Sequence, residues 1–489
     1  MKKLLWLGFP ALMLMSSCVD GLDDNYNKNP KLATQVPGVT LMSSAQRSLA
    51  RAFVSTSVNL NPFRLWVQQL AETTYPDESR YDFVTRQINN AFWNTLYRDV
   101  LRDLQESKKT ISASTVISEG GKAAQTGAIE VQEVLAWSTL VDNFGDIPYS
   151  EALDFNKPRP AYDDDKAIYN DLIKRLDAAI VNLNKEDAEL GDDFASGDLI
   201  YHGDLDKWQR FANSLKLRLA LTIADADDAQ ARAMVNQLTT AGAHFISSND
   251  ENASLVFDKT SPNTNPLWED LVQSGRTDFI ATDFFLKALS NGSAMPDPRL
   301  DDYFNEVKGV GGYKGGIAGN PHNFVYSLPG DKLRDQQFPG TLMSYSETEF
   351  LLAEAAARGL NVEGTAAAHY SAGIVASITE WGNSEEEADA YALLHPYPAT
   401  AVGFNEAAKE AIGTQKWIAL YNQPVEAWKE YRRLDYPKLT IATNSVLTAI
   451  PKRYTYPIPE QNLNTSNYNA AKAAIGGDEA STPVFWDKF

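Results

Sequence analysis

Apolar residues recur along this chain at the spacing of α-helices, and this periodicity restricts the possible folds more than any other feature of the sequence. In residues 167–183, Ile168, Leu172 and Leu176 fall on one helical face, because steps of three and four residues return to the same side of a helix. Residues 207–223 repeat the pattern. No run of alternating apolar and polar residues is long enough to indicate a large sheet. The spacing therefore predicts an all-α fold.

Residues 347–381 have the pattern of a helical hairpin. Ser346 and Glu349 match a capping box at the start of the first helix, and Gly359 supplies its end. A second helix follows and is expected to end near Gly382. The whole unit is about the size of a tetratricopeptide repeat, ~34 residues.

A second helix pair is expected at residues 123–143 and 166–184, with a long loop between its helices. Such pairs bury their apolar faces by stacking on neighbouring pairs. The predicted architecture is therefore an array of tetratricopeptide-like helix pairs packed against a loop-rich, mostly helical remainder.

The start of the chain has the features of a secretory signal. Lys2 and Lys3 precede twelve apolar residues and then Cys18, the only cysteine, whereas a membrane-spanning helix needs ~20 apolar residues. A cysteine at the expected cleavage point resembles a bacterial lipobox, so we expect residues 1–17 to be removed and Cys18 to carry lipid. Residues 18–40 would then form the lipidated N-terminus and a tether. The alternative is an ordinary signal with a chance cysteine.

Composition excludes several classes of function. The chain has 44 Lys and Arg against 64 Asp and Glu, a net charge of −20, which disfavours nucleic acid as a partner. A single cysteine excludes a cysteine-based zinc cluster, and the five histidines form no HExxH pair. The glycine-rich stretch at 309–319 matches neither phosphate-binding fingerprint, and no GxSxG serine motif occurs. We therefore expect no cofactor, no metal and no catalytic residue.

Acidic clusters leave one enzymatic alternative open. Three aspartates run from 163 to 165, and Asp297, Asp301 and Asp302 form a second group. A surface glycoside hydrolase would need two carboxylates ~5 to ~9 Å apart, and the sequence does not show such distances. In a chain this acidic, we interpret both groups as solvated surface.

Two segments break the helical pattern, at 72–94 and 257–340. Loops this long in a compact protein are usually functional, and their aromatic rings could stack on sugar rings while arginine, aspartate and asparagine bind hydroxyl groups. The alternative is that each aromatic ring pins its own loop to the helices. The candidate ligand-binding residues, chosen by residue type, are Tyr75, Asp77, Arg80, Tyr81, Trp93, Asn94, Trp268, Arg276, Tyr313 and Phe324.

Six stretches of the sequence carry recognisable motifs: VDNFGDIPYSEAL at 141–153, YHGDLDKWQRFANSLKLRLA at 201–220, DPRLDDYF at 297–304, LMSYSETEFLLAEAAARG at 342–359, QKWIALYNQPVEAWKEYRRLDYP at 415–437 and PKRYTYPIPEQNLNTSNYNAA at 451–471. Taken together, they resemble the SusD/RagB family of outer-membrane nutrient-binding lipoproteins of Bacteroidetes, and the second SusD-like subfamily in particular. Their order and spacing match over nearly the whole mature chain.

This resemblance implies a non-enzymatic protein at the cell surface, anchored in the outer membrane through Cys18. It implies a single SusD-like domain over 41–489, with a loop-rich ligand-side insertion at about 257–340. The expected partner is a SusC-like TonB-dependent transporter, and the expected ligand is an oligosaccharide or, as in RagB-like members, a peptide. A protein that only stabilises its transporter is a further alternative. The matching motifs themselves are interpreted as scaffold, including Trp208, Trp417, Trp428, Arg432 and Arg433.

Overall fold

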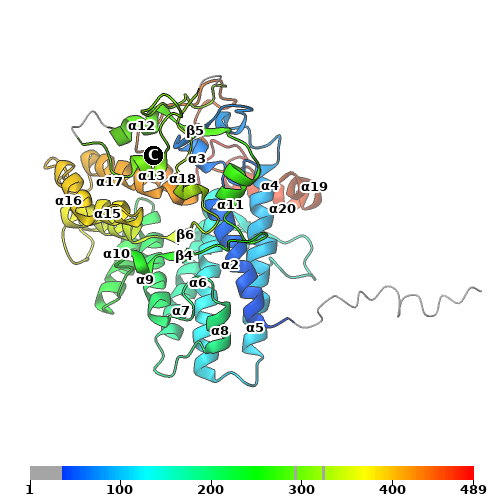
Figure 1. Cartoon of the computed structure of the whole chain (residues 1–489). Helices are drawn as coiled ribbons and strands as arrows, with labels where there is room; N and C mark the ends of the chain where they lie inside the picture. The colour runs from blue at the N-terminus through cyan, green and yellow to red at the C-terminus, as the bar shows by residue number, and fades with distance from the viewer. Residues whose placement is uncertain (1–35, 291–294, 322–324, 489) are drawn as a thin grey trace, which may run out of the picture. The chain divides into compact units, whose positions relative to one another are not determined.

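The computed structural model describes residues 36–290, 295–321 and 325–488 (Figure 1). Cys18, the signal sequence and the first part of the expected tether lie outside the described residues, as does Phe324. Gly38–Phe489 forms one compact unit. Within the described ranges, no helix combines the length and the apolar character needed to cross a membrane.

The described unit is mostly helical, as the periodicity predicts. Its α-helices are α2 (Gly38–Val54), α3 (Phe63–Trp66), α4 (Ile88–Asn94), α5 (Arg102–Ser112), α6 (Glu119–Phe144), α7 (Asp165–Leu183), α8 (Asp192–Gly197), α9 (Leu205–Thr222), α10 (Asp228–Thr240), α11 (Pro266–Trp268), α12 (Asp283–Ser290), α13 (Leu300–Tyr303), α14 (Tyr345–Ala357), α15 (Ala366–Glu380), α16 (Glu385–Leu394), α17 (Glu406–Ala419), α18 (Pro424–Leu434), α19 (Ile458–Leu463) and α20 (Thr465–Ala474). Short 3₁₀ and π segments add η1 (Glu78–Arg80), η2 (Thr95–Leu101), η3 (Asn249–Glu251), η4 (Glu269–Gln273), η5 (Lys332–Arg334) and η6 (Leu420–Asn422).

Strands are few and short. β1 (Leu70–Glu72) pairs with β5 (Phe279–Ala281), β2 (Ile147–Pro148) with β3 (Tyr162–Asp163), and β4 (Ala253–Leu255) with β6 (Gly340–Met343), each antiparallel. The described residues therefore contain only two-stranded sheets, in agreement with the absence of long alternating runs in the sequence.

The expected helix pairs are present. α6 packs along α7 and α7 along α9, and α14 packs along α15. In the second pair, a Cβ added at Gly373 would lie 3.0 Å from ring carbons of Phe350, so glycine lets the two helices approach closely. Gly359 ends α14 at a φ of 66°, a left-handed conformation that glycine adopts without steric cost.

The predicted start of α14 is wrong by two residues. Ser344, not Ser346, is the N-cap, and its hydroxyl accepts from the backbone N–H of Glu347. The sequence holds two overlapping Ser-x-x-Glu patterns, so spacing alone does not distinguish them. The Glu347 side chain binds Arg218 and does not complete a capping box. A complete box does occur at Ser384 and Glu387, at the start of α16.

A buried network of charged side chains joins α9, α14 and α18. Arg218 of α9 binds Glu347 of α14, with both nitrogen–oxygen distances at 2.6 Å. Arg433 of α18 binds Glu354 and Glu430, and burial of these three side chains is nearly complete. Charges this deeply buried are tolerated because each has an opposite charge at hydrogen-bonding distance. The arginines and tryptophans interpreted as scaffold are therefore core residues.

Candidate ligand-binding surface

Loops from distant parts of the sequence meet at the end of the unit where β5 and α12 lie (Figure 1). Two backbone hydrogen bonds continue the β1–β5 pairing into the neighbouring loops. Thr73 N–H donates to Asp278 O, and Gly316 N–H donates to Ala281 O, both at 2.8 Å. We call residues 73–87, 305–319 and 438–447 the loop platform. The β1–β5 pair therefore holds the first two of these loops in place.

Arg80 connects all three loops of the platform. Its Nε donates to Gly319 O at 2.8 Å, and its backbone oxygen accepts from Val446 N–H at 3.0 Å. A Cβ at Gly319 would lie 2.2 Å from Thr443 O, so only glycine fits where these two loops cross. The platform is held together by hydrogen bonds to backbone groups, which the sequence spacing alone does not show.

Strained backbone is concentrated in the loop platform. Of the eight non-glycine residues at positive φ in the described chain, four lie there: Tyr75, Tyr81, Gln87 and Asn444. Each such conformation costs ~1 kcal/mol or more, and strain of this kind gathers at ligand clamps and active sites. The strain makes the platform the candidate functional site.

The predicted residues of the first loop divide by exposure. Tyr75 presents 66% of its surface to solvent. The half-exposed Asp77 carboxylate lies 3.8 Å from the Arg86 guanidinium. Tyr81 is buried, and its hydroxyl accepts from Ala442 N–H at 3.1 Å. Tyr75, Asp77 and Arg80 are therefore at or near the surface, while Tyr81 pins the loop, as the alternative interpretation states.

Predicted residues of the 257–340 segment also reach the surface. Arg276 is exposed and forms an ion pair with Asp278, the residue whose carbonyl binds Thr73. The Tyr313 hydroxyl donates to Asp301 at 2.6 Å, and burial together with this bond raises the pKa of Tyr313. Trp268, at the end of α11, is half-buried.

Trp93 and Asn94 occupy a helix rather than a loop, which corrects the expected loop at 72–94. α4 covers Ile88–Asn94 and continues without a break into η2. The buried Trp93 ring packs edge-on against Phe144, with centroids 4.9 Å apart, and lies near Tyr456. These neighbours belong to the end of α6 and the C-terminal segment, a different set of elements from those around Tyr75.

The third loop of the platform contains none of the candidate residues predicted from the sequence. Residues 438–447 lie between two motifs that were interpreted as scaffold. Ile441 and Val446 are exposed there, and the left-handed Asn444 sets the turn. The signal available in the sequence was the Thr-Asn-Ser run after Pro437, which is typical of a turn between two structured motifs.

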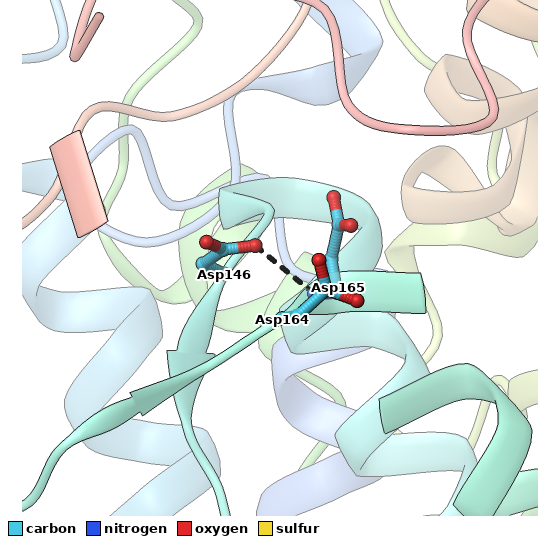
Figure 2. Close-up of side chains that lie close together, drawn as sticks. All are labelled: Asp146, Asp164 and Asp165. Atoms are coloured by element: carbon cyan, nitrogen blue, oxygen red, sulfur yellow. Dashed lines mark hydrogen bonds between the residues drawn. The ribbon is translucent and has the colours of Figure 1, made fainter. Parts of the chain in front are cut away.

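A cluster of three aspartates lies at the end of α6, where the chain turns into β2 (Figure 2). Asp146 Oδ1 accepts from Asp165 N–H at 3.0 Å, and Asp164 caps α7 by accepting from Ala167 N–H. Asp165 also accepts from Phe485 N–H. Burial, more than mutual repulsion, raises the pKa of Asp146 to about 6 and that of Asp165 to about 7.

This cluster corrects the expectation of solvated acidic surface. The carboxylate oxygens of Asp146, Asp164 and Asp165 lie within 4.8 Å of one another, but only Asp164 is exposed. Every one of the three binds a backbone N–H, so the cluster joins the helix exit, α7 and the C-terminal segment. Gly145 makes the turn possible at a φ of 78°. We interpret it as a structural junction.

The second acidic group is also structural. Asp297 is buried and binds the guanidinium of Arg299 at 2.6 and 2.8 Å. Asp302 forms an ion pair with Lys332 at 2.6 Å, and Asp301 binds Tyr313. A carboxylate held by an arginine in the core is unavailable to act on a substrate, which disfavours the glycoside hydrolase alternative at this position.

Comparison with known proteins identifies the family. A family model of SusD-like proteins, described as starch-binding and associating with the outer membrane, matches residues 30–457. The chain belongs to this SusD-like family. The motif-based resemblance is thereby confirmed, as is the all-α, tetratricopeptide-like fold. Among curated proteins, none matches the chain.

Solved structures of SusD-like proteins have the same fold. A chitin-binding protein is 26% identical, with a TM-score of 0.79 over 92% of this chain and 100% of the other. A chitin-binding SusD homologue from Flavobacterium johnsoniae is 25% identical, with a TM-score of 0.76 over 92% and 98%. A SusD homologue from Bacteroides uniformis is 28% identical, with a TM-score of 0.74 over 92% and 99%.

Proposed function

We propose that this SusD-like protein binds an oligosaccharide on the loop platform and delivers it to a TonB-dependent transporter in the outer membrane. The observation that carries the proposal is the concentration of strained backbone around an exposed tyrosine in a protein of this family. The chitin-binding activity named for two relatives supports a carbohydrate ligand.

The residues proposed to contact ligand are the surface members of the predicted set. Tyr75 offers an open ring for stacking on the apolar face of a pyranose. Arg80, Arg276 and Asp77 supply hydrogen-bonding groups for hydroxyls beside it. Tyr313 extends the surface. Trp268 lies on α11, outside the platform, and is not assigned to the ligand. Tyr81 and Trp93 are assigned to packing, and the Asn94 side chain donates to Asn90 on the same helix.

The proposed attachment follows from the start of the sequence. We propose that residues 1–17 are removed, that Cys18 is lipidated, and that residues 18–40 tether a single SusD-like domain, 41–489, to the outer face of the membrane. Cys18→Ser should release the protein from the membrane fraction of its native host, and the wild-type protein should co-purify with a β-barrel transporter. This part of the proposal would be contradicted if Cys18→Ser stayed in the membrane fraction, or if the wild-type protein purified without a transporter.

The ligand class can be tested by calorimetry on the chain without residues 1–18. We expect heat of binding from chitin oligosaccharides, with starch oligosaccharides and a protein digest as the competing classes. Binding of the digest alone would identify a peptide-binding protein and overturn the carbohydrate assignment. Release of shortened sugars from any of these oligosaccharides would overturn the assignment as a non-enzymatic protein.

A further inference from the structure

A histidine ring bridges the helix pair α14–α15 and the turn that connects the two helices. His369 lies in the first turn of α15, and its Nδ1 is 2.7 Å from Glu349 Oε2 of α14. The other ring nitrogen, Nε2, is 2.7 Å from Glu363 O in the turn. A Cβ added at Gly364 would lie 2.6 Å from the same Nε2. The turn is therefore shaped around the imidazole ring.

Both partners of the ring are hydrogen-bond acceptors. A neutral imidazole carries one N–H donor and can satisfy only one of these two oxygens, whereas an imidazolium carries two donors and satisfies both. Imidazole is also a stronger base than a carboxylate, with an ordinary pKa of ~6.5 against ~4.3. A proton shared between His369 and Glu349 therefore resides on the ring, and the observed geometry is that of a charged histidine.

Other polar and charged groups face this ion pair from neighbouring elements. Tyr345 of α14 forms a hydrogen bond to the same Glu349 carboxylate. Arg210 of α9 lines the same cavity as the ring and is paired with Glu251 of η3, at 3.4 Å. His244, which is exposed, also lines this cavity. Glu349 is therefore the carboxylate that balances the charge on the ring.

The turn held by the ring forms one edge of this cavity. The cavity measures about 390 Å³ and is enclosed by α9, residues 239–247, α14 and the turn. The first part of the turn is anchored separately, because Arg232 of α10 donates to the backbone oxygens of Arg358 and Gly359, each at 3.1 Å. His369 holds the second part, residues 362–365, through Glu363 O.

We propose that His369 is a pH-sensitive clamp, which fixes residues 362–365 against α14 when it is charged and releases them when it loses its proton. Release follows because a neutral ring leaves a nitrogen without a proton facing an oxygen at 2.7 Å. Movement of this turn would open the edge of the cavity. The clamp belongs to the helix pair and not to the loop platform, so it does not rest on the proposed function.

The direction of the pH effect follows from linkage. The hydrogen bond to Glu349 raises the pKa of His369, and the carbonyl of Glu363 acts in the same direction, while burial opposes them. The clamped turn therefore binds the proton more tightly than the released turn. The clamp is complete below the ordinary histidine pKa of ~6.5 and is lost as the pH rises through the raised value. Its release should also loosen the start of α15, where Ala368 N–H donates to the Thr365 hydroxyl at 3.1 Å.

Hydrogen–deuterium exchange on the chain without residues 1–18 tests the clamp. Between about pH 6 and about pH 9, after correction for intrinsic exchange rates, amides of residues 362–369 should lose protection by ~fivefold or more. His369→Ala should give low protection at both pH values. Glu349→Gln should give high protection at both, because its amide can donate to a neutral ring while the ring donates to Glu363 O. His244→Gln, which removes an exposed histidine from the same cavity, is the matched control and should behave as wild type.

The outcomes decide the clamp independently of any ligand. Equal protection of the wild-type turn at the two pH values, or the same pH dependence in wild type and His369→Ala, would overturn it. If His369→Ala fails to fold, Glu349→Gln decides the question, because a loss of protection at high pH as large as in wild type would equally overturn the clamp. No oligosaccharide is present in these measurements, so failure of the clamp leaves the proposed function intact, and failure of oligosaccharide binding leaves the clamp intact.

Discussion

At the residue scale, buried charge is the feature that most distinguishes this protein from a simple helical array. Arg218 and Glu347 are almost fully buried, and the Gln423 side chain donates to the same carboxylate at 2.8 Å. The sequence shows that these residues occur on helices, but it does not show that they pair, because their partners are 76 to 129 positions away. Pairing of this kind depends on how helices pack rather than on local spacing.

Removing one partner of this pair should be strongly destabilising. Glu347→Ala would leave the Arg218 charge buried without its main counter-ion, which costs about 3–5 kcal/mol of unfolding free energy. Glu106→Ala, which removes an exposed glutamate 3.4 Å from Lys109, should cost less than ~0.5 kcal/mol. Urea unfolding measures the loss of unfolding free energy in both variants. Similar losses in the two would show that the buried ion pair contributes no more to stability than an exposed one.

At the scale of elements, the sequence predicts helices well and contacts between loops poorly. The helices expected at 167–183 and 207–223 are α7 and α9, with boundaries that differ by one or two residues. Periodicity reports which face is buried, and that information is local. The loop platform, in contrast, depends on backbone hydrogen bonds such as that from Val446 to Arg80, for which side-chain type gives no signal. For the same reason, the predicted site included the buried Tyr81 and missed residues 438–447.

The helix exit at Asp146 should make stability depend on pH. The pKa values of Asp146 and Asp165 are raised to about 6 and about 7, so the folded state binds more protons than the unfolded chain between pH ~4 and ~7. Stability from this pair is therefore greatest at acidic pH and declines as the pH rises through that window.

Asp146→Asn removes one of the two charges and keeps an oxygen for Asp165 N–H. Between pH 5 and pH 8, the wild-type chain should lose on the order of 1–3 kcal/mol relative to this variant. Urea unfolding at the two pH values measures the difference. An identical pH dependence in the two proteins would show that burial does not raise the pKa of Asp146 in the folded state.

At the scale of the whole molecule, α18 joins helices from distant parts of the sequence in one core. Five of its charged residues are buried, and they bind partners on α6, α9, α14 and α17: Glu426, Lys429, Glu430, Arg432 and Arg433. We therefore expect Gly38–Phe489 to unfold as one cooperative unit despite its length. Tryptophan fluorescence and far-UV circular dichroism should give coincident urea transitions. Separate midpoints would instead indicate that the helix pairs and the loop-rich part fold independently.

Binding of an oligosaccharide to the loop platform through Tyr75 is tested by titrating chitin oligosaccharides into the wild-type chain, Tyr75→Ala and Phe155→Ala. Tyr75→Ala should weaken binding by about fivefold or more, equivalent to ~1 kcal/mol, with no change in melting temperature. Phe155→Ala removes a similarly exposed aromatic ring, 75% exposed and stacked on Arg102 away from the platform, and should bind as wild type. Equal affinity of wild type and Tyr75→Ala would show that the oligosaccharide does not bind through Tyr75.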